Sequence, residues 1–175
     1  MEPGPRVRRL SVSDRERFRA LRLEALTTDP RAFGSNYERE RAYPAEKWEG
    51  WVTGGASGTD QATFLAVDGS GNPFGMVGVF SHEGSPHIWG MWVRPDHRGQ
   101  GWGKTLLAEC LRWVEGVFPG QEVFLEVNPE EKAAVRTYLR SGFAFNGISQ
   151  PLGHWDPPQS AHQMVRKRRD SSAPG

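Results

Sequence analysis

Apolar residues in the first third of the chain recur at helical spacing. The residues that share one face are Phe18, Leu21 and Ala25. Ser13 and Glu16 have the spacing of a capping box, so a helix is predicted to begin there and to end before Pro30. A second helix is predicted to begin after Pro44 and to end in the glycine-rich stretch 54–58.

Strand-like apolar runs follow at short intervals. They cover residues 6–10, 62–67, 74–80, 87–93, 122–127, 143–148 and 162–165. Residues 68–72 are turn-forming, which predicts an antiparallel hairpin between the runs on either side. Helical patterns after residue 103 and over 130–140 separate the later strands. This strand, helix, strand, helix order predicts a parallel crossover within a mixed α/β sheet.

Composition limits the class of protein. A chain of 175 residues fits one domain, predicted over 1–169, with a flexible tail at 170–175. The net charge of +1 argues against nucleic-acid binding as the main function, although 166–169 is a basic run. Cys110 is the single cysteine and no run approaches the ~20 apolar residues of a membrane span. Without a recognisable signal peptide, the expected location is the cytoplasm.

A glycine-rich loop lies between the strand 87–93 and an apolar helix. Its residues are Arg98, Gly99, Gln100, Gly101, Trp102, Gly103, Lys104 and Thr105. The first amides of a helix have no intrahelical partners and lie at the positive end of its dipole, so this loop predicts a phosphate site. The helix that follows places Cys110 on its apolar face, which predicts a core thiol rather than a nucleophile.

Spacing distinguishes three kinds of glycine loop. A Walker loop requires glycine where this chain has Arg98, and a dinucleotide fingerprint lacks its third glycine. The pattern that remains is [Gln/Arg]-x-x-Gly-x-[Gly/Ala], filled by Arg98, Gly101 and Gly103. In this loop the chain resembles the GNAT family of acetyl-CoA-dependent N-acyltransferases, which bind the cofactor pyrophosphate with this pattern.

A second segment strengthens the resemblance. A strand ends at Asn128, a helix with small residues follows, and Tyr138 precedes Gly142 and Phe143 at the spacing found in GNAT enzymes. The resemblance is strongest over residues 61–147. It implies the GNAT fold, with a mostly antiparallel mixed sheet of about six to seven strands, one parallel central pair and about four flanking helices.

The resemblance also implies where acetyl-CoA binds. The backbone of Met91, Trp92 and Val93 would contact the pantetheine arm, and the glycine loop would hold the pyrophosphate. A bulge is expected in this strand, because the parallel pair must separate to admit the cofactor. Asn128 would contact the pantetheine or order the opened strand. Glu131 stands where many relatives have a second asparagine.

The implied reaction is direct transfer of the acetyl group to a primary amine in a ternary complex. The amide of Trp92 or Val93 would stabilise the oxyanion, and Tyr138 would protonate the departing thiolate. Tyr138 has an alternative reading as a packed core aromatic. The pattern does not choose among four candidates for the base that deprotonates the amine: Glu126, Glu83, His87 and an ordered water.

The sequence pattern leaves a second function open. A non-catalytic acyl-CoA-binding module would have the same loop, whereas the chain lacks the glycine that a nucleotide hydrolase with a Walker loop requires. The five histidines are scattered, so no metal site is predicted. The acceptor would bind the segments 26–53 and 148–161, which contain three tryptophans: Trp48, Trp51 and Trp155. A homodimer is common among members of this family.

Overall fold

The computed structural model describes residues 3–152 and 159–167. Within them one seven-stranded sheet is formed by β1 (Arg6–Arg9), β2 (Gln61–Val67), β3 (Pro73–His82), β4 (Ser85–Val93), β5 (Val123–Val127), β6 (Phe143–Leu152) and β7 (Gln159–Arg166). The α-helices of this part of the chain are α1 (Arg15–Thr28), α2 (Tyr37–Arg41), α3 (Ala45–Ser57), α4 (Trp102–Val117) and α5 (Lys132–Arg140). The predicted tail at 170–175 lies outside the described residues.

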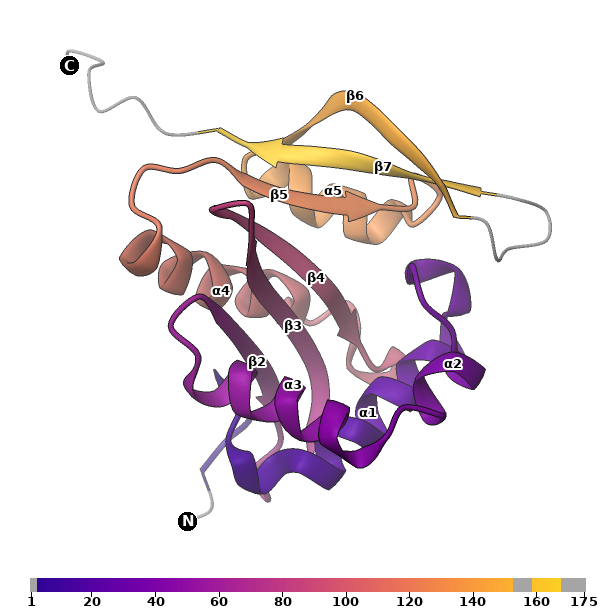
Figure 1. Cartoon of the computed structure of the whole chain (residues 1–175), viewed down its shortest axis with the longest axis vertical. Coiled ribbons are helices and arrows are strands. Elements are labelled where there is room, and N and C mark those ends of the chain that lie inside the picture. Colours follow the sequence, from indigo (N-terminus) through magenta and orange to yellow (C-terminus); the bar gives the residue numbers. More distant parts are fainter. Residues whose placement is uncertain (1–2, 153–158, 168–175) are drawn as a thin grey trace.

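The strands lie in the order β1-β2-β3-β4-β5-β7-β6, and every neighbouring pair is antiparallel except β4 and β5. The predicted mixed, mostly antiparallel sheet with one parallel central pair is therefore confirmed. Helices α4 and α5 contribute to one buried core, while α1 and α3 contribute to a second. Figure 1 shows α1 and α3 in front of the sheet and α4 behind it.

The parallel pair separates soon after it forms. Its register covers only His87 with Phe124 and Ile88 with Leu125, after which β4 and β5 diverge, as Figure 1 shows. On the β3 side, the pairing jumps from Trp89 to Trp92, so two β4 residues stand opposite one β3 residue. One of them, Gly90, has φ of +66°, which favours glycine. The expected bulge is present, and it lies beside the opening in the sheet.

The first helix begins differently from the prediction. The capping box is made by Ser11 and Asp14 and belongs to a 3₁₀ turn, Val12–Asp14, that leads into α1 at Arg15, so the assignment of Ser13 and Glu16 was wrong. Both pairs have the required spacing. The Asp14 carboxylate accepts from the Ser11 amide at 2.9 Å and from the Arg8 guanidinium at 2.6 and 2.8 Å. Asp14 thus joins the turn before α1 to Arg8 of β1.

Helix α3 ends within the glycine-rich stretch 54–58, as predicted. Gly54 and Gly55 lie inside it, and Gly58 is its C-cap residue. An added Cβ at Gly55 would lie 2.7 Å from Thr63 Oγ1 of β2. Gly55 is therefore small because the helix packs closely on the sheet, and the helix ends inside the predicted stretch, at Ser57.

Candidate functional site

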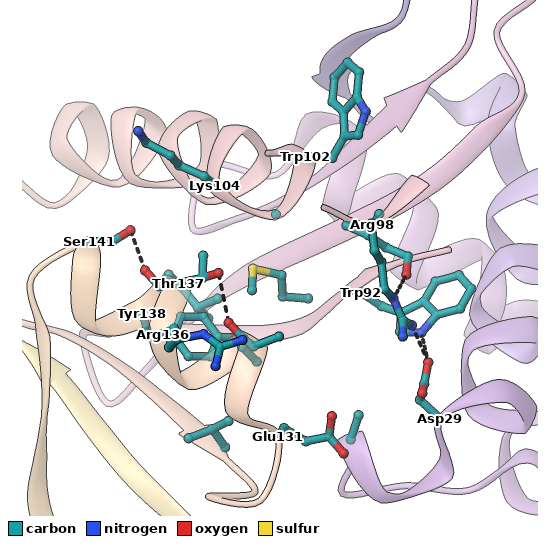
Figure 2. A pocket seen from close by; sticks show the side chains of 18 of the residues that line it. Asp29, Trp92, Arg98, Trp102, Lys104, Glu131, Arg136, Thr137, Tyr138 and Ser141 are labelled. Carbon is teal, nitrogen blue, oxygen red and sulfur yellow. Dashed lines mark hydrogen bonds and ion pairs between the residues drawn. The ribbon is translucent and has the colours of Figure 1, made fainter. Parts of the chain in front are cut away.

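A cavity of about 600 Å³ opens where β4 and β5 diverge. We call it the loop cavity, because the glycine loop forms one wall and α5 forms the opposite wall, as Figure 2 shows. Most of the residues predicted to bind the cofactor line it, namely Met91, Trp92, Val93, Arg98, Gly99, Gly101, Trp102, Gly103 and Lys104. Gln100, Thr105 and Asn128 are outside this lining.

A second cavity, of about 710 Å³, lies on the side of α1 and α2, and we call it the helix-side cavity. The residues common to both linings are Ala32, Ile88, Trp89, Gly90 and Glu126. These residues include the β4 bulge and the end of β5. The gap in the sheet therefore connects one cavity with the other.

The glycine loop presents unpaired backbone amides to the loop cavity. Gly99 has φ of +72° and Gly101, the N-cap residue of α4, has φ of +85°, so both positions favour glycine. The first amide to find an acceptor is that of Thr105, which donates to Gly101 O at 3.0 Å. Among the described residues, the amides of 99–104 have no acceptor. This is the arrangement that binds a phosphate at a helix N-terminus.

Arg98 anchors the glycine loop through two hydrogen bonds of its guanidinium group. Its Nε donates to Val93 O at 2.8 Å, and its Nη2 donates to Asp29 Oδ2. Asp29 Oδ2 also accepts from Trp92 Nε1 at 2.7 Å, and Figure 2 shows these three side chains together. In the structure Arg98 thus holds the glycine loop to β4 and to Asp29.

Other basic side chains around the loop cavity remain available. They are Lys104, Arg136 and Arg140, which form no ion pair with any residue in 3–152 or 159–167. Trp102 also lines the cavity, and its ring packs edge-on against Phe74 with 5.1 Å between centroids. Trp102, which stands at the unspecified position between Gly101 and Gly103 of the loop pattern, thus covers the core beneath the loop.

The β4 ladder indicates which amides face the gap. Arg94 N donates to Phe74 O at 2.8 Å, and Val93 is registered with Gly75. In an antiparallel pair the hydrogen-bonded positions alternate, so the amide and carbonyl of Val93 point away from β3. The Val93 carbonyl accepts from Arg98, which is consistent with this direction. The Val93 amide therefore faces the gap, whereas the alternation turns the Trp92 amide toward β3.

Tyr138 projects from α5 into the wall of the loop cavity (Figure 2). Its side chain packs against Phe143, with 5.9 Å between ring centroids and an interplanar angle of 63°. Burial raises the pKa of Tyr138 above its ordinary value, and the nearby Cys110 adds to this. The phenol therefore keeps its proton at neutral pH. The predicted core packing and the predicted position in the site are both present.

The structure separates the candidates for the base. Glu126 lines both cavities at their junction. His87 lines the helix-side cavity and stacks on Phe124 at 5.2 Å, and burial lowers its pKa. Glu83 is exposed in the turn between β3 and β4, with φ of 50°, and is in neither lining. Of these three candidates for the base, Glu126 is thus the one that lies where the two cavities meet.

Asn128 is tied to its surroundings rather than to the loop cavity. Its Nδ2 donates to Arg31 O at 3.2 Å and to Gln159 Oε1 at 2.6 Å, while its Oδ1 accepts from the Glu130 amide at 3.0 Å. Of its two expected roles, ordering the opened strand is the one that these contacts support. Gln100 and Thr105 likewise bond within their own segment, to Asp96 O and Gly101 O.

Further acidic and aromatic residues complete the linings of the two cavities. Asp29 and Glu131 line the loop cavity, and burial, followed by the charge of Asp29, raises the pKa of Glu131. Trp51 lines the helix-side cavity, whereas Trp48 is a core residue that is 3% exposed. Trp155 lies outside the described residues. Among those described, no three His, Cys, Asp or Glu side chains are arranged to hold a metal ion.

An opened parallel pair, a bulge and a glycine loop at a helix N-terminus are the features of a GNAT-type acyltransferase fold. The chain belongs to the acetyltransferase (GNAT) family, whose model matches residues 20–143. No helix in the part of the chain that the structure describes is long and apolar enough to cross a membrane.

Two curated relatives are acetyltransferases with different acceptors in their names. Streptothricin acetyltransferase of Streptomyces lavendulae is 30% identical over 63% of this chain and 60% of its own. Mycothiol acetyltransferase of Cellulomonas flavigena is 27% identical over 100% of this chain, which spans 51% of that protein. The chain thus spans little more than half the length of these relatives.

A solved structure shares the fold over nearly the whole chain. The protein yncA of Salmonella typhimurium, a putative acetyltransferase with its cofactor acetyl-CoA, superposes with a TM-score of 0.76 at 15% identity, covering 99% of each chain. At this identity the likeness demonstrates the GNAT fold.

Proposed function

We propose that this protein transfers the acetyl group of acetyl-CoA directly to a primary amine while both substrates are bound. The observation that carries the proposal is the pair of cavities that meet at the gap between β4 and β5. Direct transfer requires the donor and the acceptor to reach one point from two sides. The buried Cys110, whose pKa is raised by burial, lines neither cavity, which favours transfer without a covalent cysteine intermediate.

The loop cavity fits the donor. Its free amides at 99–104 suit the pyrophosphate, with Lys104 as the nearest basic side chain of the loop. The pantetheine arm would lie along β4, where the divergence of β5 leaves the Val93 amide facing the gap. Acetyl-CoA is a soluble metabolite, and a single buried thiol suits a reducing compartment, so we place the reaction in the cytoplasm.

The reacting groups take the following roles in this proposal. The amine nitrogen attacks the thioester carbonyl, the Val93 amide stabilises the oxyanion, and the C–S bond then breaks. Glu126 accepts the proton of the amine, directly or through water, because an alkylammonium with a pKa of about 10.4 must lose a proton before it attacks. Tyr138 donates its hydroxyl proton to the departing sulfur and recovers it from solvent.

The decisive experiment incubates the protein with acetyl-CoA and a broad panel of amines and measures release of free thiol. Amine-dependent release with N-acetyl product in equal amount supports the proposal. Tight binding of acetyl-CoA without release for any amine would instead identify a non-catalytic acyl-CoA-binding module. The second cavity and the placement of Tyr138 favour the enzyme.

A further inference from the structure

The helix-side cavity contains a buried cationic group that the proposed reaction does not use. The Arg22 side chain is 6% exposed and forms a two-pronged pair with Glu40, Nε to Oε2 at 2.9 Å and Nη2 to Oε1 at 2.8 Å. Its third nitrogen, Nη1, is buried and has no partner among the described residues. A buried donor without an acceptor is unfavourable, so its presence in a cavity needs an explanation.

The surroundings of Arg22 fix where Nη1 points. The guanidinium lies over the rings of Phe33 and Trp89, with its central carbon 4.8 and 5.5 Å from their centroids. An ideal Cβ built on Gly90 would lie 3.3 Å from Nη1. Gly90 belongs to the bulge and lines both cavities. Nη1 is therefore held beside the junction of the two cavities, where the acceptor would meet the thioester.

A second unpartnered polar atom lines the same cavity. Ser35 Oγ is buried and makes no hydrogen bond within residues 3–152 and 159–167. Arg39 also lines this cavity and forms no ion pair with the described residues. Because Glu40 balances the charge of Arg22, Arg39 gives this part of the cavity an excess positive charge. Glu126 provides a negative charge at the junction.

We propose that Arg22 Nη1 and Ser35 Oγ bind a carboxylate of the acceptor, so that the substrate class is an amine that also carries a carboxylate. This inference rests on the proposed function and adds to it the polarity of the acceptor. Nη1 offers two N–H groups and the serine offers one hydroxyl, which matches the acceptor oxygens of a carboxylate. The charge distribution then directs the amine toward Glu126 and the thioester. The aromatic lining, with Trp51, Trp89 and Phe33, suits an apolar side chain on the same molecule.

The test assays the whole chain with sets of matched acceptors and compares their rates. Each standard amino acid is assayed beside its carboxamide and its decarboxylated amine, for example L-phenylalanine, L-phenylalaninamide and 2-phenylethylamine. Thiol release from acetyl-CoA is measured for each. We expect kcat/KM for the preferred amino acid to exceed that for its two analogues at least about 10-fold, the loss expected for a buried, charge-assisted contact. Equal or better turnover of the analogues overturns the carboxylate assignment and leaves the acetyltransferase proposal standing.

A variant separates ligand binding from folding. Ser35→Ala removes no hydrogen bond of the free protein, so we expect unchanged thermal stability, a KM for the amino acid raised about 10-fold and an unchanged KM for the decarboxylated amine. Ser35→Thr should restore the KM. Ser160→Ala, at an exposed position of β7 that lines neither cavity, is the control. Replacing Arg22 would leave Glu40 unpaired in the interior and is a poorer test.

A binding measurement covers the case in which no amine is acetylated. Calorimetry with the protein saturated by coenzyme A and the same amino acids as probes reports the carboxylate site without turnover. Binding that is lost in Ser35→Ala supports the site even if the transferase proposal fails. Absence of binding to any carboxylate-bearing probe overturns it.

Discussion

Replacing Gly103 by leucine tests the phosphate cradle without disturbing the fold. Gly103 lies in the first turn of α4 and has no positive φ, and an ideal Cβ there meets no atom within 4 Å. Leucine is preferred to glycine in helices, so the free protein should gain about 0.5 kcal/mol and melt about 1–2 °C higher. The loop pattern admits alanine at this position, whereas the larger leucine side chain would occupy the space in which a pyrophosphate approaches the amides of residues 99–104.

The loss of ligand affinity follows from the hydrogen bonds at risk. A phosphate displaced from two amides loses two charge-assisted bonds of about 1.5 kcal/mol each, or about 3 kcal/mol in total, which corresponds to roughly 10²-fold weaker binding. Isothermal calorimetry with coenzyme A measures this directly, and thermal unfolding measures the stability of the same sample. Retention of full affinity by a stable Gly103→Leu protein would refute the assignment of this loop as the pyrophosphate site.

Two other glycines serve as controls. Gly116→Ala lies in the same helix, also has open space around its Cβ position and lines neither cavity, so it should raise stability without changing coenzyme A binding. Gly101→Ala faces a different penalty, because its φ of +85° strains any other residue by about 1–2 kcal/mol. We expect it to lower stability and affinity together.

Three further predictions concern side chains. Tyr138→Phe should lower kcat by about 10²-fold with little change in the KM for acetyl-CoA, measured by steady-state thiol release; unchanged kcat would leave only the packing role. Asp29→Asn removes the anionic partner of Arg98, so the KM for acetyl-CoA should rise about 10-fold while kcat is nearly constant, and an unchanged KM would contradict the anchoring role. Asp14→Asn should cost about 2 kcal/mol in urea unfolding at pH 7, because the hydrogen bond from the part-exposed Arg8 lowers the pKa of Asp14. This Asp14 contribution is fully present above the unfolded pKa of about 3.9 and disappears as the pH falls through the lower folded value, so the deficit should close in acid; a deficit that persists there would contradict it.

Local patterns in the sequence were sufficient to predict the strands, turns and helices that support the site. The turn-forming stretch between two apolar runs predicted the β2–β3 hairpin, and the strand, helix, strand, helix order predicted the parallel crossover. The conformation of the glycine loop follows from local chemistry, since Gly99 and Gly101 adopt the positive φ values that glycine permits. Such features involve residues that are close along the chain.

The partners that position the site are far apart along the chain, and the sequence did not predict them. Asp29 meets Trp92 and Arg98 across more than sixty positions, and the basic loop residue therefore becomes an anchor rather than a free charge. Arg22 and Glu40 belong to different helices, and no periodicity marks them as a buried pair.

The short register of β4 with β5 has a mechanical consequence. Within residues 3–152 and 159–167, two registered residue pairs join the half of the sheet that contains β1–β4 to the half that contains β5–β7, and beyond them the Val93 amide faces the gap. A ligand that lies in the gap would supply the missing strand partner and bridge the two halves. Hydrogen exchange at Met91 and Val93 should then slow on saturation with coenzyme A, and the melting temperature should rise with its concentration. The donor would then be a substrate that also stabilises the sheet for as long as it is bound.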